Sequence, residues 1–380
     1  MNRYQEMLRP VWAEIDLEAI RHNIGAIRRL VGPTVAVMAV VKAEAYGHGA
    51  VPVAQTALAA GATWLGVALP EEGIALRRAG FTAPILIFSP LQAEQVTAVV
   101  AADLISCVCD LETVTALAQA AAGVGKTASV HVKLDTGMGR VGVPASEAAR
   151  FVAAISELPG IRVDGVFSHL ATADERNKTY ARQQIANFNQ ALAALQAAGQ
   201  LPPHIHLGNS AAVIDLPDAH FNLVRPGIIT YGLRPSAEVD LDRIELRPAL
   251  ALKTRISFVK RVPPGTGISY GQRYHTGQTT SIATIPIGYA DGWSRLLSHK
   301  AQALVGGKKF PIVGTICMDQ CLIDVGDEPV AVGQEVVLIG SQGAERITVD
   351  DVAAQLGTIN YEVTCMLSNR VPRVYLHEHS

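Results

Sequence analysis

The sequence predicts an α/β fold in which a barrel of eight strand–helix repeats is followed by a smaller, mainly β domain. From Trp12 onward, short apolar runs alternate with alanine-rich amphipathic segments, as expected of parallel strands that alternate with helices. After about residue 235 the pattern changes to β-type runs separated by Gly/Pro turns. The chain has 380 residues, whereas one core typically holds about 100–200 residues, so two domains are expected.

Eight apolar runs of strand length define the expected barrel, and helical periodicity fills the intervals between them. Eight repeats predict a closed (β/α)8 TIM-type barrel, whose chemistry lies at the carboxyl ends of the strands. Such barrels often bind phosphate in the loops after strands seven and eight. The expected strands are 35–43, 63–69, 84–89, 104–110, 129–135, 162–169, 204–208 and 223–231, and the expected helices are 16–30, 51–60, 70–79, 91–102, 111–122, 146–158 and 180–198.

The barrel is expected over residues 12–240 and the β-rich domain over 241–380, with residues 1–11 packing against the β-rich domain. Within this domain only 349–356 has a helical pattern. The expected extended runs are 251–259, 280–288, 309–316, 336–339, 363–366 and 371–376.

Composition narrows the class of partner. Hydrophobic residues make up 49% of the chain, the net charge is -2, and no block of Lys or Arg occurs, which argues against nucleic acid or an anionic membrane. Residues 1–11 carry no apolar signal region, and no apolar run approaches the roughly 18 residues of a membrane span. We therefore expect a small-molecule partner and a cytoplasmic location. The five cysteines lack Cys-x-x-Cys spacing, so they are expected to be reduced and to hold no metal.

Lys42 stands at the carboxyl end of the first apolar run, before a turn with Gly47 and Gly49. Burial disfavours the charged form of a lysine and lowers its pKa from a reference of about 10.4, which makes the amine a usable nucleophile or base. The alternative is a lysine whose amine reaches solvent from the strand end. The residue types alone favour this alternative.

The segment VKAEAYGHG at 41–49 resembles the pyridoxal-phosphate lysine motif of bacterial alanine racemases, and the likeness extends from about Trp12 to Tyr375. The resemblance implies that Lys42 forms a Schiff base with pyridoxal 5′-phosphate and that Tyr46 lies in the cofactor site. The family usually has Asn or Asp where this chain has Glu44.

The fifth and sixth strands end in charged groups. The segment KLDTGMGR at 133–140 is either a salt-bridged rim or a site for a substrate carboxylate. It resembles a racemase segment, which implies that Arg140 engages the cofactor phenolate and the substrate carboxylate, and that Lys133 is the position often carbamylated. His169 follows the sixth strand, and the resemblance implies that it packs near the pyridine ring, so we expect it to orient the ring and not to transfer protons.

The seventh and eighth strands end in HIHLGNSA at 204–211 and VRPGIITYG at 224–232. Two histidines spaced by two could chelate zinc, but no third or fourth ligand is nearby in the sequence. The resemblance assigns His206 and Asn209 to the cofactor environment and Ser210 to its phosphate. It assigns Arg225 to the pyridine nitrogen, where an arginine makes the cofactor a weaker electron sink than an aspartate would. Backbone N–H groups at Gly227 and Ile228 are expected to approach the phosphate.

Three segments of the β-rich domain also resemble racemase segments: GISYG at 267–271, IGYADGW at 287–293 and GTICMDQ at 314–320. The resemblance implies that Tyr270 is a second base, that Tyr289 lines the substrate entrance, and that Met318 and Asp319 lie at the substrate carboxylate. A tyrosine has a reference pKa near 10, so a basic role needs cationic neighbours, for which His169 and Arg225 are candidates. In the family this domain reaches the active site of the other subunit, which implies a homodimer.

The resemblance implies interconversion of L- and D-alanine by two opposed bases, Lys42 and Tyr270, which supplies D-alanine for peptidoglycan. Some relatives have tyrosine at the position of Asn369, near the pocket mouth, and a smaller side chain there could admit serine. A broader alanine/serine racemase is therefore one alternative. A non-catalytic pyridoxal-phosphate-binding barrel and a decarboxylase of related architecture are the others.

Overall fold

The computed structural model describes residues 8–377, which form two compact units. The barrel unit comprises residues 19–45 and 50–247, and the β unit comprises 8–18, 46–49 and 248–377 of the described residues. Residues 1–11 were expected to pack against the β-rich domain, and of these, residues 1–7 lie outside the described residues.

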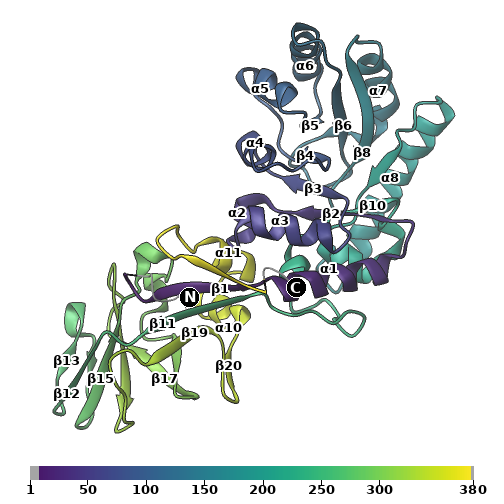
Figure 1. The fold of residues 1–380 in the computed structure, drawn as a ribbon. Coiled ribbons are helices and arrows are strands. Elements are labelled where there is room, and N and C mark those ends of the chain that lie inside the picture. The colour runs from purple at the N-terminus through teal and green to yellow at the C-terminus, as the bar shows by residue number, and fades with distance from the viewer. Residues whose placement is uncertain (1–7, 378–380) are drawn as a thin grey trace. The chain divides into compact units, whose positions relative to one another are not determined.

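All eight expected apolar runs of the barrel unit occur as strands of one parallel sheet, in the order β10-β2-β3-β4-β5-β6-β8-β9, with the short β7 added to β6. β10 and β9 are the two edge strands of this sheet, and a hydrogen bond of 2.9 Å from Arg225 N to Gly208 O joins the chain just after them. The prediction of a barrel is confirmed (Figure 1). The strands are β2 (Ala36–Val40), β3 (Trp64–Val67), β4 (Ile85–Ile87), β5 (Ile105–Val108), β6 (Ala128–Asp135), β7 (Val143–Pro144), β8 (Ile161–Phe167), β9 (His204–His206) and β10 (Leu223–Val224).

Helices follow the strands and lie outside them (Figure 1). Several begin where a polar side chain satisfies the first amides; Asp110, for example, accepts from Thr113 N at 2.7 Å. The helices are α1 (Leu17–Val31), α2 (Lys42–Tyr46), α3 (Ala50–Ala59), α4 (Pro70–Arg78), α5 (Val96–Ala101), α6 (Leu111–Gly123), α7 (Ala148–Ser156), α8 (Thr179–Ala197) and α9 (Ser210–Asp215), with 3-10 turns η1 (Ala93–Gln95), η2 (Ala145–Glu147), η3 (Pro217–Ala219) and η4 (Ile228–Tyr231).

The eighth strand is much shorter than the apolar run 223–231 predicts. β10 ends at Val224, and after Pro226 and Gly227 the chain enters the 3-10 helix η4 (Ile228–Tyr231). Proline has no N–H to donate to a strand ladder, and Gly227 adopts φ -102° and ψ -92°, so the strand cannot continue. The second half of the run 223–231 is apolar because it forms the buried 3-10 helix η4 and not because it continues the strand.

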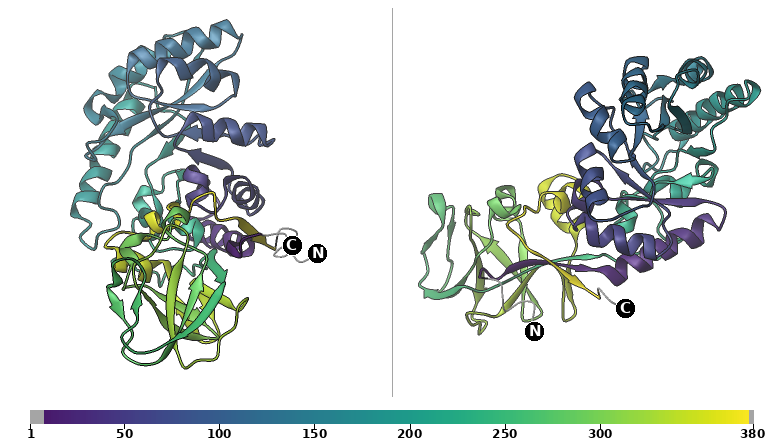
Figure 2. Two further views of the ribbon diagram at one scale, coloured as in Figure 1. Left: turned by 90° about the vertical axis from the view of Figure 1, so that its left-hand side faces the viewer. Right: turned by 45° about the horizontal axis from the view of Figure 1, so that its top comes forward.

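Figure 2 shows the β unit as a group of green and yellow strands. Its sheet has the order β12-β15-β18-β17-β16-β19-β11-β1-β21, with β20 paired to β19 and a separate β13-β14 ribbon. Its strands are β1 (Val11–Asp16), β11 (Leu250–Arg255), β12 (Phe258–Val262), β13 (Gly267–Ile268), β14 (Tyr274–His275), β15 (Thr280–Ile285), β16 (Gln302–Val305), β17 (Lys308–Val313), β18 (Cys321–Gly326), β19 (Glu335–Gln342), β20 (Glu345–Ile347) and β21 (Arg373–Leu376).

The strand β1 differs from the sequence analysis, which assigned 12–16 to the barrel. It runs antiparallel to β11 and parallel to β21 inside the β unit. Its partners lie more than 230 residues further along the chain, from Leu250 onward, so no local pattern could identify them.

The β unit also contains two helices, α10 (Val349–Leu356) and α11 (Asn360–Cys365), and the 3-10 turns η5 (Tyr270–Gln272), η6 (Tyr289–Asp291) and η7 (Arg295–Leu297). The prediction of an extended run at 363–366 is wrong, because Val363 to Cys365 belong to α11. The buried residues of α11, Asn360, Val363 and Thr364, have helical spacing. Val363 and Thr364 are β-branched, a residue type that favours strands, so the sequence pattern suggested an extended run. No helix among residues 8–377 is long and apolar enough to cross a membrane.

Candidate active site

Lys42 opens a turn of unusual handedness. β2 ends at Val40, and Ala43, Glu44, Ala45 and Tyr46 then adopt φ of 52°, 53°, 52° and 54°. The left-handed region costs an L-residue about 1–2 kcal/mol, and non-glycine residues visit it as single residues, so four in a row must be held by their surroundings. The structure therefore concentrates backbone strain directly after the lysine.

Two carboxylates hold this turn. Glu72 Oε1 accepts from Ala43 N at 2.6 Å, while its Oε2 accepts from Ala68 N at 2.7 Å and Leu69 N at 3.1 Å. Glu44 Oε2 accepts from Ala50 N at 3.3 Å, so the residue that departs from the family pattern bonds to the first residue of α3. Glu72 lies on α4, and nothing in the sequence signals its contact with the lysine turn.

Four cationic side chains from the ends of three strands, β2, β6 and β10, act on His169. Its pKa lies well below the usual value, first because of burial and then because of the positive charges of Arg225, Lys133, Arg140 and Lys42. The structure thus brings together in the barrel unit the basic residues that the sequence singled out. Such a concentration of positive charge attracts a ligand that carries phosphate or carboxylate groups.

This depressed pKa corrects one expectation. His169 was a candidate for the positive charge needed beside a basic tyrosine, but its imidazole is neutral at pH 7. Within the barrel unit, that charge has to come from the arginine and lysine side chains.

Arg225 is buried, and its hydrogen-bond acceptors among the described residues are all neutral. Its Nη1 donates to His206 Nδ1 at 2.9 Å, and its Nη2 donates to Ser168 O at 2.7 Å, Leu207 O at 3.1 Å and His169 Nδ1 at 3.3 Å. Burial lowers the pKa of Arg225 to about 9, so it stays protonated at neutral pH. Three of these contacts share the two N–H groups of Nη2, so the Nε–H and one Nη1–H have no acceptor among the described residues.

Lys133 is buried on β6 with its Nζ 4.4 Å from the centre of the Phe167 ring. Burial is the first cause that lowers the pKa of Lys133 to about 7, and the positive charge of Arg225 is the second. Among the residues that the structure describes, no carboxylate forms an ion pair with this amine. An amine in this state is partly unprotonated and nucleophilic at neutral pH.

The loop that carries Arg140 is organised by Asp135 and by α8. Asp135 Oδ1 accepts from Gly137 N at 2.9 Å and from Gly139 N at 3.1 Å. From α8, Tyr180 Oη donates to Gly137 O at 2.6 Å. Arg140 itself is exposed and makes no ion pair with a described residue. Asp135 thus shapes a turn, and Arg140 extends from it.

Sequence reasoning missed Gln184, which joins two strand ends. This buried side chain on α8 accepts from Ala171 N at 2.8 Å, and its Nε2 donates to His169 O at 3.0 Å and Thr136 Oγ1 at 3.4 Å. A polar residue on the apolar face of a helix is the sequence signal that could have found it, because buried polar groups need partners.

The loops after β9 and β10 meet through Ser210 and Gly227. Gly227 N donates to Ser210 Oγ at 2.8 Å, and Asn209 caps α9 by accepting from Ala212 N at 3.1 Å. Ile228 opens a 3-10 helix, so its amide precedes the first hydrogen bond of that helix. The serine hydroxyl and the amides at these two helix starts are therefore suited to bind an anion.

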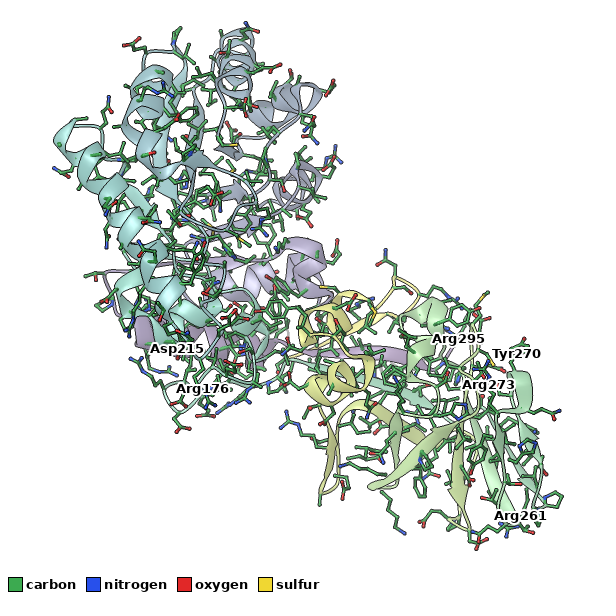
Figure 3. All side chains as sticks on the ribbon, turned by 180° about the vertical axis from the view of Figure 1, so that it is seen from behind. Arg176, Asp215, Arg261, Tyr270, Arg273 and Arg295 are labelled. Atoms are coloured by element: carbon green, nitrogen blue, oxygen red, sulfur yellow. The ribbon has the colours of Figure 1, made fainter. Side chains whose placement is uncertain are left out.

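In the β unit, the loop 314–320, which contains Met318, makes hydrogen bonds to the segments that carry Tyr270 and Tyr289. Thr315 Oγ1 donates to Tyr270 O at 2.9 Å, Tyr289 N donates to Cys317 O at 3.1 Å, and Ala290 N donates to Met318 O at 3.1 Å. Tyr270 is 71% exposed and stands at the surface of this unit (Figure 3). A cavity of about 410 Å³ lies beside Tyr289, and it is also lined by Gly292, Ser294, Arg295 and Met366.

A chain of ion pairs fixes the neighbouring segment 368–373. Arg370 donates to Asp319 Oδ1 at 2.6 Å and lies 3.4 Å from the buried carboxylate of Asp291, to which Arg9 donates two hydrogen bonds of 2.7 and 2.9 Å. Asn369 is exposed beside Arg370. Asp319 is thus held by a fixed arginine, and Asn369 projects from an ordered segment.

Tyr46 belongs to the β unit together with residues 47–49. Its ring lies 6.0 Å from that of Tyr361, and burial raises the pKa of its hydroxyl far above the usual value. Within the β unit, residues 46–49 are tightly packed, because a Cβ on Gly47 would lie 2.1 Å from Thr364 O. Among residues 8–377, no three His, Cys, Asp or Glu side chains are arranged to hold a metal ion.

The chain matches two protein families in succession: the alanine racemase N-terminal domain over residues 15–235 and the alanine racemase C-terminal domain over 249–375. A protein named alanine racemase from Desulforamulus reducens is 50% identical over 372 residues, covering 97% of this chain and all of the relative. Another, from Desulfovibrio desulfuricans, is 48% identical over 369 residues, covering 97% of this chain and 98% of the relative.

Solved structures show the same likeness. An alanine racemase of Clostridium difficile 630 superposes with a TM-score of 0.94 at 42% identity and covers 98% of this chain and 97% of its own. The alanine racemase of Bacillus anthracis with bound L-Ala-P gives a TM-score of 0.92 at 41% identity, covering 97% and 96%. The two domain families match the barrel and the β unit in order, and the relatives are matched over almost their whole length. This chain belongs to the alanine racemase family.

Proposed function

We propose that this protein interconverts L- and D-alanine with pyridoxal 5′-phosphate. The observation that carries the proposal is the environment of Arg225. This buried guanidinium has neutral acceptors alone among residues 8–377, and none of them accepts from its Nε–H. A donor that stays protonated suits an unprotonated pyridine nitrogen, which can only accept. The family membership and the lysine at the strand end support the same reading.

The other residues of the barrel unit fit the remaining parts of this cofactor. Lys42 Nζ would hold its aldehyde carbon, and Ser210 Oγ with the amides of Gly227 and Ile228 would hold its phosphate. Arg140 would face the phenolate, His169 the ring, and Asn209 would complete the surroundings within the barrel unit. The family resemblance adds Tyr46, which belongs to the β unit. When bound, pyridoxal phosphate supplies an electron sink that acidifies the Cα–H of an attached amino acid.

Inversion needs a proton acceptor on one face of Cα and a proton donor on the other. We assign Lys42 Nζ to one face and Tyr270 Oη to the opposite face. In the family the β domain reaches the active site of the other subunit, so we propose a homodimer in which Tyr270 serves Lys42 of the partner. The exposure of Tyr270 on the β unit is consistent with a role in a neighbouring copy.

The substrate is proposed to be a small amino acid. Its carboxylate would be bound by Arg140, the Met318 amide and the region of Asp319, with Tyr289 at the entrance. One related structure is described with bound L-Ala-P and another with cycloserine, both small molecules. Because Asn369 is exposed and small at the position where some relatives carry tyrosine, a second candidate is a racemase that accepts serine as well. The product D-alanine would serve peptidoglycan synthesis.

The test is chiral chromatography of the purified protein with pyridoxal phosphate, incubated separately with L-alanine and L-serine. Rapid formation of D-alanine supports the proposal, and comparable formation of D-serine supports the broader racemase. Release of CO2 from the amino acid without a D-product would favour a decarboxylase, and no reaction at all would favour a non-catalytic binding protein.

A further inference from the structure

His131 reaches an active-site histidine from two strands away. In the sheet order β6-β8-β9, His131 pairs with Gly165, and His206 pairs with Phe167, so β8 separates the two histidines. Their rings nevertheless make a hydrogen bond of 2.8 Å between His131 Nδ1 and His206 Nε2. Gly165 makes room for this contact, because a Cβ there would lie 2.6 Å from the His131 ring.

The direction of each hydrogen bond follows from Arg225. A guanidinium only donates, so His206 Nδ1, at 2.9 Å from Arg225 Nη1, must accept and carry no proton. Both histidines are neutral: burial lowers the pKa of His131 to about 3, and burial and the charge of Arg225 lower the pKa of His206 well below its usual value. The single proton of His206 is therefore on Nε2, and it is donated to His131 Nδ1.

This tautomer leaves the remaining proton of His131 on Nε2. That atom is buried and has no hydrogen-bond partner among the residues that the structure describes. A buried N–H without an acceptor lowers stability, and an apolar side chain would fill the same space without this cost. Packing alone therefore does not explain a histidine at position 131, whereas the acceptor at Nδ1 does.

We propose that His131 is a positioning residue: by accepting the Nε2–H of His206 it stabilises the tautomer that the bond to Arg225 requires, and it thereby holds Arg225 in place for its ligand. The ligand role of Arg225 rests on the proposed function, but the chain of contacts from His131 to Arg225 does not. His206 is further aligned by its ring, which stacks on Phe167 at 4.7 Å with 8° between the planes. Without an acceptor at His131, the Nε2–H of His206 is unpaired, and the other tautomer would turn an N–H toward the N–H of Arg225.

Two variants of similar size separate this role from packing. His131→Asn keeps an acceptor oxygen close to the position of Nδ1, whereas His131→Leu removes it. His204→Leu is the control, because the His204 ring stacks on that of His131 at 6.0 Å but belongs to none of the hydrogen bonds from His131 to Arg225. Thermal unfolding of each variant identifies any that fail to fold, and His131→Asn remains informative if His131→Leu is unstable.

The primary measurement is the tautomer of His206 in the cofactor-free protein, read from long-range proton–nitrogen NMR correlations after labelling histidine with ¹⁵N. We expect a bare Nδ1 and a protonated Nε2 in the wild type, His131→Asn and His204→Leu. In His131→Leu we expect a population with the proton on Nδ1, because the unpaired buried Nε2–H destabilises the native tautomer. A protonated Nδ1 in the wild type, or an unchanged pattern in His131→Leu, overturns the proposal.

The second measurement is racemisation kinetics with saturating pyridoxal phosphate. For His131→Leu we expect kcat to fall about tenfold, the lower end of the loss seen when the hydrogen-bond partner of a metal-ligating residue is removed, with KM for alanine nearly unchanged. His131→Asn should recover most of this loss, and equal kcat losses in both variants would contradict positioning through the acceptor. If the wild type has no racemase activity, the function fails while the NMR result still decides the tautomer.

Discussion

The carboxylate of Glu72 accepts a hydrogen bond from the amide of Ala43, the residue directly after Lys42, at 2.6 Å. The same carboxylate accepts from Ala68 N and Leu69 N, so one side chain joins the lysine turn to the start of α4. Because Ala43 is the first residue with positive φ in this turn, the contact stabilises a backbone that the local sequence disfavours.

Glu72→Ala should therefore destabilise the protein and misplace Lys42. The loss of a carboxylate that accepts three amide hydrogen bonds is expected to cost about 1–2 kcal/mol of unfolding free energy and to lower kcat. Chemical denaturation and steady-state kinetics measure the two effects. The neighbouring Glu71→Ala is the control, since Glu71 is exposed. Equal effects of both substitutions would show that Glu72 has no special role in holding the turn.

A mixture of two inactive variants tests the shared active site. Lys42→Ala and Tyr270→Phe should each be nearly inactive as homodimers. If Tyr270 serves the partner's Lys42, a heterodimer of the two variants contains one site with both bases intact. With random pairing, half of the dimers are mixed and each has one of two sites, so co-expression should restore about one quarter of wild-type activity.

Activity no higher than that of either variant alone would mean that both bases come from one chain, or that Tyr270 is not a base. Sedimentation analysis of the wild type provides the control, because a protein that stays monomeric at assay concentration cannot form the mixed site.

Most of the barrel could be predicted because parallel strands covered on both faces are continuous apolar runs, such as Val37 to Val41. The basic residues at strand ends could be predicted because charged groups after such runs have few structural explanations. The roles of Lys42 and Tyr270 came from resemblance to a family, and they remain predictions.

Other features were outside the reach of local patterns. The left-handed turn after Lys42 depends on a distant carboxylate at Glu72, since alanine and glutamate have no preference for that backbone. The contact between His131 and His206 depends on strand order and on the missing side chain at Gly165. Each of these features is set by tertiary contacts, which sequence periodicity does not encode.

Lys133 should form a carbamate at neutral pH. Only the unprotonated amine reacts with CO2, and because the pKa of Lys133 is about 7, about half of the amine is available at pH 7. Raising the pH above 7 increases that fraction, and lowering it removes the nucleophile. A carbon NMR signal after equilibration with ¹³C-bicarbonate should therefore appear in the wild type and disappear in Lys133→Met. Lys126→Met is the control, because Lys126 forms an ion pair of 2.9 Å with Asp103 near the surface.

Asn369→Tyr should make the enzyme more selective for alanine. Asn369 is exposed beside Arg370, which the Asp291 and Asp319 carboxylates hold in place, so a larger side chain there would project from a fixed segment and could not easily turn away. A pocket discriminates only modestly against one added hydroxyl group, and steric exclusion is the available means of strengthening that discrimination. We expect the ratio of kcat/KM for serine to that for alanine to fall about tenfold, measured by chiral chromatography of initial rates. A ratio that stays constant while both rates fall would mean that residue 369 affects the order of the segment and not the size of the substrate that enters.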